Sequence, residues 1–446
     1  MMADRWDSLR LTIATLLAGV VVGVLGALFI GTLGRMDGVR LALVDFTLGQ
    51  SFPGWLAAVI VGVLGAGSAA WLAHRFAPDA PFAPDAPQAA ASLIPDPPRQ
   101  PTSPVSALTV NFGGTGLAVA AGLVVGPSRP AIQMGGAIGR LTSRLLRLSA
   151  SDADLLMAAT GGAGVATMFN SPLGCAAYTV EAVLKRVDLR ISLIALGAGA
   201  TAVGVSRLLT GRHVNFTVEA LPAYKFEHLL LYLLLGVLIG GLAHLHLRTI
   251  KSIAAMARRL PLPRVARAAL IGAAVGLLGW FAPGLVGTGA ALVQSVVDGK
   301  FALSMLALAL LIRFFLGPLS LAAGTPGGYF APSLALGALS GAVFAEMAGV
   351  LLPAADLPST TAFALVGMAV ALAAIAHAPF TGILLAVETT GAFIMALPMI
   401  VAVFEAFMVI RFLKSPVLTH GLEAVEARLH AATASTPEAH EGNSPH

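Results

Sequence analysis

The chain has 446 residues, of which 57% are hydrophobic and 11% are charged, and its mean hydropathy is +0.86. A soluble globular domain carries far more charge, so these values exclude that class and favour a polytopic membrane protein made of helices. The net charge of +5 is modest, and the single cysteine, Cys175, rules out an intrachain disulfide and a cysteine-based metal site.

Apolar runs along the chain predict the membrane helices. Long spans are expected at residues 11–33, 55–73, 107–125, 192–209, 229–247, 268–282, 301–322, 362–375 and 398–413, with shorter pieces at 131–146, 155–168, 173–184 and 333–352. Many are near or below the roughly 20 residues that a perpendicular span requires, so we expect tilted, partial and re-entrant helices. The first run exceeds the hydrophobic region of a secretory signal and no clear cleavage site follows it, so we expect the chain to keep it.

These spans predict the organisation of the chain. We expect N-terminal helices over residues 1–76, a Pro-rich connector over 77–104, a first repeat core over 105–210, a mid-chain helix with a basic loop over 211–267, a second repeat core over 268–413 and a short hydrophilic tail over 414–446. The loop contains Arg248, Lys251, Arg258, Arg259, Arg264 and Arg267. By the positive-inside rule this loop lies on the cytoplasmic side of the membrane, and we expect the protein in the inner or plasma membrane of the cell. Because these residues only separate two apolar spans, no nucleic-acid partner is predicted.

The same pattern of helix breaks occurs once in each half of the chain. Each copy begins with a Gly-x-x-x-Pro stretch, and a glycine follows five residues after that proline. A second proline comes later in each copy, and a glutamate follows it by nine residues. The first copy consists of Gly126, Pro130, Gly135, Pro172 and Glu181, and the second of Gly328, Pro332, Gly337, Pro379 and Glu388. Paired breaks inside apolar segments are the sequence mark of a transport protein built from repeats.

The breaks at Gly126 to Pro130 and at Gly328 to Pro332 predict an anion pathway. Broken membrane helices survive only where they are buried or line a wet cavity. A proline in the first turn of a helix costs little and leaves the preceding amides pointing outward, where they and the helix dipole attract anions. Two such ends that meet would bind an anion without a full positive charge, and would repel a metal cation.

Residues 327–337, with the sequence Gly-Gly-Tyr-Phe-Ala-Pro-Ser-Leu-Ala-Leu-Gly, are similar to the Gly-x-Phe-x-Pro signature of the CLC chloride channels and chloride/proton antiporters. Residues 126–139 resemble the Gly-Lys/Arg-Glu-Gly-Pro signature of that family followed by Gln-x-Gly-Gly-x-Ile-Gly, and residues 169–173 resemble a third family element. The resemblance extends over residues 11–416. It implies an all-α polytopic membrane protein, an inverted repeat with tilted, broken and re-entrant helices, and a homodimer whose subunits each hold an anion pathway.

The resemblance also implies which residues bind the anion. The backbone amides of Tyr329, Phe330 and Ala331 would hold it from the second half, and Ser128 with its neighbours from the first. The family's Gly-Ser-Gly-Ile-Pro signature is matched only loosely at residues 91–95, which makes Ser92 a candidate hydroxyl donor. The alternative is that Ser92 is simply a polar residue of the connector.

Departures from the family pattern bear on mechanism. Ser128 stands where the signature has the glutamate that gates the pathway and relays protons, and a hydroxyl cannot accept a proton near neutral pH. Pro127 removes an amide N–H, and Arg129 replaces a glycine. Arg129 would attract anions, or else snorkel to water or pair with a carboxylate. The residue that receives cytoplasmic protons in the antiporters of the family corresponds to Ala182 in this chain. The inner-gate tyrosine of the family corresponds to Leu418.

Two acids remain near apolar runs, Glu181 and Glu388, and an intramembrane carboxylate is a functional candidate by default. Their equal placement favours a shared structural role, such as accepting hydrogen bonds from the break before each helix. A proton-transfer role for Glu181 stays open. His377 occupies the place of Asn170 in the repeat, and for it a packing or capping role is favoured over a metal ligand or a pH sensor.

The predicted function is passive conduction of chloride or a similar monovalent anion by a homodimer in the bilayer, without obligatory proton exchange. The alternatives are chloride/proton antiport through Glu181, fluoride transport, and a degenerate member that acts by association with a partner. An enzyme is not expected, because the chain offers no nucleophile, acid/base pair or metal-ligand group at useful spacing. No cofactor and no metal are predicted.

Overall fold

The computed structural model describes residues 2–47, 53–76, 103–211, 215–219, 221 and 223–417, and these residues are all-helical apart from short turns and one β-bridge. The helices are α1 (Met2–Thr47), α2 (Gly54–Phe76), α4 (Pro104–Ala120), α5 (Ser128–Leu145), α6 (Ala150–Phe169), α7 (Pro172–Tyr178), α8 (Leu189–Thr210), α9 (Leu229–Arg259), α10 (Arg264–Phe281), α11 (Ala290–Val297), α12 (Leu303–Ala322), α13 (Phe330–Leu351), α14 (Thr360–Ala376), α15 (Pro379–Thr390) and α16 (Ala396–Phe412). Eight candidate spans in the described part are long and apolar enough to cross a membrane. The predicted all-α polytopic membrane class is confirmed.

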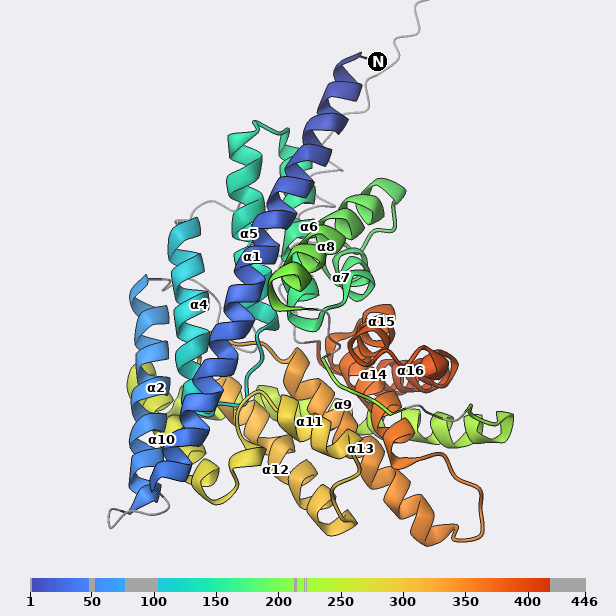
Figure 1. The fold of residues 1–446 in the computed structure, drawn as a ribbon. Helices are drawn as coiled ribbons and strands as arrows, with labels where there is room; N and C mark the ends of the chain where they lie inside the picture. The colour runs from blue at the N-terminus through green and yellow to red at the C-terminus, as the bar shows by residue number, and fades with distance from the viewer. Residues whose placement is uncertain are drawn as a thin grey trace, which may run out of the picture.

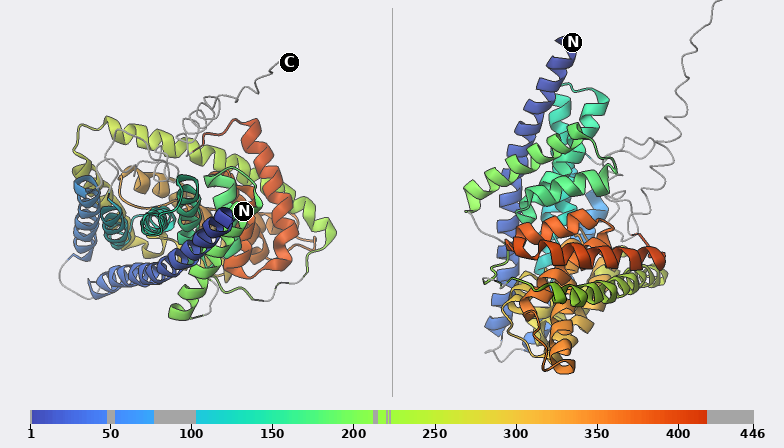
Figure 2. Two further views of the ribbon diagram at one scale, coloured as in Figure 1. Left: turned by 90° about the horizontal axis from the view of Figure 1, so that it is seen from above. Right: turned by 90° about the vertical axis from the view of Figure 1, so that its right-hand side faces the viewer.

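The two halves of the chain follow the same order of helix contacts. In the first half α5 packs on α6 and α1 on α8; in the second half α13 packs on α14 and α9 on α16. The halves meet where α2 packs against α10 and where α7 packs against α15. Figure 1 shows α5 to α8 gathered in the upper part and α11 to α16 in the lower part, with α1 running beside both. Figure 2 shows the same helices from above and from the side.

The helix that follows each break is held tightly to the next helix by a glycine. A Cβ atom added at Gly135 of α5 would lie 2.1 Å from the carbonyl oxygen of Thr160 in α6. At the equivalent Gly337 of α13, it would lie 2.2 Å from the carbonyl oxygen of Gly367 in α14. Real Cβ atoms do not approach oxygen so closely, so only glycine fits at these two places. The packing fixes the directions of α5 and α13, and with them the two breaks.

Two of the predicted boundaries differ in the structure. The basic segment is mostly helix rather than loop, because α9 continues through Arg258 and Arg259 and α10 begins at Arg264. Only residues 260–263 connect them, with prolines at 261 and 263. The piece expected at 333–352 is instead the 22-residue helix α13, which is long enough to span. It starts earlier than expected because a proline is tolerated in the first turn of a helix.

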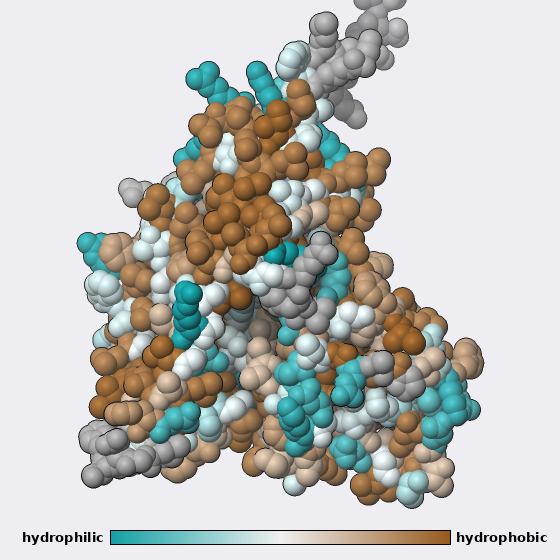
Figure 3. Space-filling model, viewed as in Figure 1, coloured by the Kyte–Doolittle hydropathy of each residue, from teal (hydrophilic) through white to brown (hydrophobic). Residues whose placement is uncertain are grey.

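Large apolar side chains cover much of the outer surface. Figure 3 shows broad hydrophobic areas on the face seen there. Leu208, Leu230 and Phe404, on three different helices, are 86%, 71% and 58% exposed. Exposed apolar area of this extent is unfavourable in water and is expected where lipid chains cover the protein.

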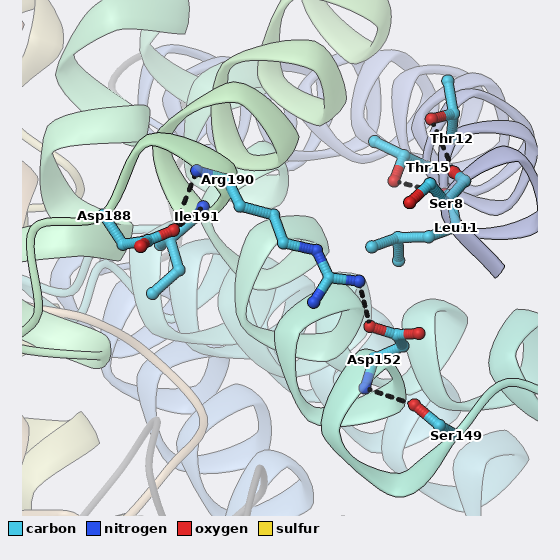
Figure 4. A network of polar contacts seen from close by, with 9 residues as sticks. All are labelled: Ser8, Leu11, Thr12, Thr15, Ser149, Asp152, Asp188, Arg190 and Ile191. Atoms are coloured by element: carbon cyan, nitrogen blue, oxygen red, sulfur yellow. Dashed lines mark hydrogen bonds and ion pairs between the residues drawn. The ribbon is translucent and has the colours of Figure 1, made fainter. Parts of the chain in front are cut away.

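Polar groups at helix ends fix the start of α6 against α8 (Figure 4). The Ser149 hydroxyl accepts a hydrogen bond from the Asp152 amide, which caps α6. Asp188 caps α8 in the same way, by accepting from the amides of Arg190 and Ile191. The Arg190 guanidinium lies 2.6 Å from the Asp152 carboxylate, so the two capped helix ends are joined by an ion pair.

Candidate functional site

The two predicted helix breaks lie against each other. The Gly126 amide donates to the Gly328 carbonyl oxygen at 2.7 Å, and the Gly328 amide donates to the Gly126 carbonyl oxygen at 2.6 Å. This pair is an isolated antiparallel β-bridge between the two halves of the chain. Because Gly126 and Gly328 are buried, this pairing satisfies backbone polar atoms that would otherwise lack partners.

A second pair of glycines turns the chain into each break. Gly122 follows the end of α4 with φ of 79°, and Gly324 follows the end of α12 with φ of 70°. A left-handed glycine just past a helix end is a common way to stop a helix. Each stands four residues before the bridging glycine, so the repeat extends further towards the N-terminus than the predicted pattern did.

The bridge is followed in both halves by the start of a helix with its proline in the first turn. Ser128 and Arg129 open α5, and Pro130 is its third residue. Phe330 and Ala331 open α13, and Pro332 is its third residue. The first amides of a helix have no intrahelical partner, and a proline has no amide to satisfy. Two helix starts with free first amides therefore adjoin one bridge, and free amides at helix starts are able to attract an anion.

The side chains at the two helix starts are buried. Ser128 is 2% exposed, Arg129 3% and Phe330 1%. The Ser128 hydroxyl lies so close to the opposite break that a Cβ atom added at Gly328 would be 2.1 Å from it. Because Arg129 is buried, the alternative in which it snorkels to water is wrong.

An aromatic group surrounds the start of α13. Phe330 packs edge-on against Tyr178 of α7, with ring centroids 5.4 Å apart. Its ring is tilted against that of Phe169 at the end of α6, with centroids 6.2 Å apart. Its neighbour Tyr329 lies 5.3 Å away. Tyr178 is not among the residues predicted for the site. A tyrosine within an apolar helix gives no local signal, and only the packing of α7 brings it beside Arg129 and Phe330.

Glu181 and Glu388 form a second symmetrical arrangement. Glu181, in the π-helical turn that follows α7, accepts hydrogen bonds from the Phe380 amide at 3.1 Å, the Thr381 amide at 2.9 Å and the Thr381 hydroxyl at 2.8 Å. Glu388, near the end of α15, accepts from the Ser171 hydroxyl at 2.5 Å and from the Gly174 amide at 2.9 Å.

These hydrogen bonds correct the predicted partners. Each glutamate was expected to accept from the break before its own helix. Instead each accepts from the helix start in the other half of the chain, Glu181 from α15 and Glu388 from α7. A carboxylate at a helix N-terminus satisfies free amides and complements the helix dipole.

Replacing Glu388 with alanine is expected to destabilise the protein by about 1–3 kcal/mol, because the Ser171 hydroxyl and the Gly174 amide would lose a charged acceptor. Glu181→Ala should cost at least as much, since three donors lose their partner. Thermal unfolding of the purified protein in detergent measures both. The exposed Glu219 offers the control: Glu219→Ala should leave the unfolding temperature unchanged. Equal stability of all three variants would refute a capping role.

Asn170 and His377 take equivalent positions, as the repeat predicted. Both residues follow a helix end and have a left-handed backbone conformation, Asn170 with φ of 53° after α6 and His377 with φ of 54° after α14. Each therefore occupies a capping position, which agrees with the favoured interpretation of His377. Asn170 also accepts a hydrogen bond from the Arg207 guanidinium at 2.7 Å.

Glu227, His228 and Asp356 bring three possible metal-ligand atoms within 4.8 Å of one another, a group that the sequence did not indicate. Two of its members, His228 and Asp356, already have partners. The His228 ring lies 3.0 Å from the Asp356 carbonyl oxygen, and the Lys225 ammonium pairs with the Asp356 carboxylate. That hydrogen-bonded pair raises the pKa of Lys225 and lowers the pKa of Asp356. The group ties the start of α9 to the connection between α13 and α14.

The structure thus brings together the predicted helix-break residues Gly126, Pro130, Gly328 and Pro332 with the predicted anion-binding residues Ser128, Arg129, Tyr329, Phe330 and Ala331. Glu181 and Glu388 belong to the separate contacts between α7 and α15. Ser92, the predicted hydroxyl donor, and Leu418, at the place of the inner-gate tyrosine, lie outside the described residues.

Known proteins are similar to this chain in sequence and in fold. The profile of the family described as "Voltage gated chloride channel" matches residues 65–411. The chain is 33% identical to the H(+)/Cl(-) exchange transporter ClcA of Vibrio parahaemolyticus over 411 residues, which is 89% of this chain and 85% of the relative. It is 30% identical to ClcA of Salmonella arizonae over 449 residues, covering 96% and 92% of the two chains.

Solved structures agree. The structure of a slow cyanobacterial Cl-/H+ antiporter superposes with a TM-score of 0.85 at 26% identity, over 96% of this chain and 99% of the other. A CLC-type fluoride/proton antiporter has the same fold, with a TM-score of 0.71 at 20% identity over 89% and 94% of the two chains. The paired helix breaks, the profile match and these relatives lead to one conclusion: the chain belongs to the CLC family of voltage-gated chloride channels and related anion transporters.

Proposed function

We propose that this CLC protein conducts chloride or a similar monovalent anion passively, without obligatory proton exchange. The observation that carries the proposal is Ser128, the first residue of α5, buried beside the opposite break at Gly328. The resemblance to the family signature implies that other family members carry a glutamate at this position, which blocks the pathway and relays protons. A serine hydroxyl carries no charge and does not titrate near neutral pH.

The anion would be held by backbone groups and one buried cation. The amides of Ser128 and Arg129 open α5, and those of Phe330 and Ala331 open α13, on the two sides of the Gly126–Gly328 bridge. The Arg129 guanidinium adds a full positive charge in a buried setting, where electrostatic attraction is stronger than in water. Neither element supplies a proton acceptor.

Glu181, the acid considered as a substitute proton carrier, is poorly suited to that role. Ala182 occupies the place of the second proton site and cannot titrate. Its neighbour Glu181 accepts three hydrogen bonds at the start of α15. Protonating this carboxylate would weaken these contacts, since a neutral carboxyl group is a weaker hydrogen-bond acceptor than a carboxylate. A proton relay through Glu181 would therefore disturb the contact between α7 and α15 in every cycle.

Coupled chloride/proton exchange is the second candidate, because the relatives of this chain from Vibrio and Salmonella are named H(+)/Cl(-) exchange transporters. Fluoride transport rests only on the shared fold of the fluoride/proton antiporter.

We further propose a homodimer with one pathway in each subunit, located in the inner or plasma membrane, and a transport rather than an enzymatic role.

The test is chloride efflux from liposomes that contain the purified protein, with internal pH recorded and valinomycin present to set the voltage. We expect chloride to leave without uphill proton movement. The ClcA relative from Vibrio parahaemolyticus, assayed in parallel, provides the reference for coupled exchange. Proton uptake in fixed proportion to chloride would overturn passive conduction and direct attention to Glu181. No flux of chloride or fluoride would favour a member that acts by association.

A further inference from the structure

A second cluster of buried charge lies away from the bridge, at the start of α11. Arg313, in the middle of α12, is 3% exposed, and its guanidinium donates to the Gly287 carbonyl oxygen at 3.0 Å. The Nε and Nη2 atoms of Arg313 have no hydrogen-bond partner in the part of the chain that the structure describes. Buried guanidinium groups normally use these donors, so the two free atoms require an explanation.

The free side of Arg313 points at the N-terminus of α11. Gly289 is the N-cap of this helix, and a Cβ atom added there would lie 1.8 Å from Nη2 and 2.8 Å from Cζ of Arg313. Gly289 has φ of 88°, so both its conformation and the lack of space require glycine. The Nη2 end of the guanidinium therefore contacts the N-cap, next to the start of α11, whose first amides have no intrahelical partner.

The cluster carries excess positive charge. Arg40 of α1 forms two hydrogen bonds with Asp37, at 3.0 and 2.9 Å. Both lie next to Gly287, because a Cβ atom added there would be 3.1 Å from Asp37 Oδ1 and 3.6 Å from Arg40 Nη2. Asp37 is thus paired with Arg40, whereas Arg313, which donates to the Gly287 carbonyl oxygen of the same loop, has no carboxylate partner among the described residues. A buried excess cation of this kind is expensive unless an anion accompanies it.

The cluster lies close both to the protein surface and to α13. Ala290 and Ala291, the first two residues of α11, are exposed. On the other side, a Cβ atom added at Gly289 would lie 3.2 Å from the Ala335 side chain of α13. Ala335 follows Ala331 by four residues, which is roughly 6 Å along a helix. The cluster therefore lies about one helical turn from the predicted anion-binding amides of α13.

We propose that Arg313 and the first amides of α11 form a second anion-binding site, which takes a small monovalent anion and supplies it to the pathway at the paired breaks. A single net positive charge and a short helix suit a halide better than a multiply charged anion. The identity of the anion rests on the proposed function; the site itself rests on Arg313, Gly289 and the cluster around Gly287.

Crystals of the full chain grown with bromide test the site directly, because bromide gives an anomalous signal. We expect a bromide peak between Arg313 Nη2 and the amides of Ala290 and Ala291, absent in Arg313→Met, as well as a peak at the paired breaks. Bromide at the breaks but none beside Arg313 in the wild type would overturn the inference and leave the proposed function standing. Bromide beside Arg313 alone would support the inference and contradict the pathway.

Liposome flux supplies the functional readout. In Arg313→Met the chloride concentration for half-maximal flux should rise on the order of tenfold, since a charged hydrogen-bond donor is lost, while flux at saturating chloride changes little. Arg313→Lys should recover part of the loss. Arg248→Met, which removes an exposed charge on α9, is the matched control and should leave the half-maximal concentration unchanged. An equal change in Arg313→Met and Arg248→Met would mean that only overall charge matters.

Discussion

Replacing Ser128 with glutamate is expected to make chloride flux fall as pH rises, by about tenfold or more between pH 4 and 7, given an ordinary glutamate pKa of about 4.3. The residue opens α5 beside Gly328. An ionised carboxylate there would compete with the permeant anion for the amides of α13 and for Arg129. At low pH the carboxyl group binds a proton, loses its charge and releases the site. Efflux from liposomes at a series of pH values measures the effect.

Ser128→Gln is the control for size, because glutamine has the shape of glutamate without its charge. It should lower flux by a factor that does not depend on pH. The wild type, with no titratable group at this position, should also show a flat profile over the same range. If Ser128→Glu and the wild type gave the same pH profile, the placement of Ser128 at the gate would be wrong.

The paired breaks could be predicted because their signals are local. A proline in the first turn, a glycine four residues earlier and an apolar run after it each follow from backbone chemistry, and Pro130 and Pro332 repeat them at equal spacing. The fold class could also be predicted, because the high apolar fraction and the apolar runs are read directly from the sequence. What the spacing could not show is that the two breaks are hydrogen-bonded to each other through Gly126 and Gly328.

The features that escaped prediction all depend on contacts between distant segments. Glu181 and Glu388 were predicted as hydrogen-bond acceptors, but their exchange of partners between halves is set by the packing of α7 on α15. Tyr178 and Arg313 are single polar residues within apolar helices, and a sequence does not tell which neighbours they meet. The basic segment was predicted as a loop because it lies between two apolar spans, whereas α9 continues through it to Arg259, since arginine and lysine are good helix formers.

A bulky side chain at Gly328 is expected to abolish anion flux. A Cβ atom there would lie 2.1 Å from the Ser128 hydroxyl oxygen and 2.7 Å from the Arg129 backbone nitrogen. The hydroxyl could rotate away, but the backbone nitrogen belongs to the start of α5 and cannot move without displacing the bridge to Gly126. Gly328→Leu should therefore separate the two helix starts and reduce chloride efflux to the level of empty liposomes. Flux is compared at equal amounts of folded, reconstituted protein.

Two further glycines make the effect specific. Gly349 lies near the end of the same helix, α13, and a Cβ atom added there meets nothing within 4 Å, so Gly349→Ala should conduct normally. A Cβ atom added at Gly126, on the other side of the bridge, would lie 3.0 Å from the Ala331 side chain, its nearest neighbour. Gly126→Ala should therefore lower flux only in part. The expected order of flux is Gly349→Ala, then Gly126→Ala, then Gly328→Leu. Wild-type efflux in folded Gly328→Leu would mean that anions do not pass between the paired breaks, because the crowding there would have had no effect on them.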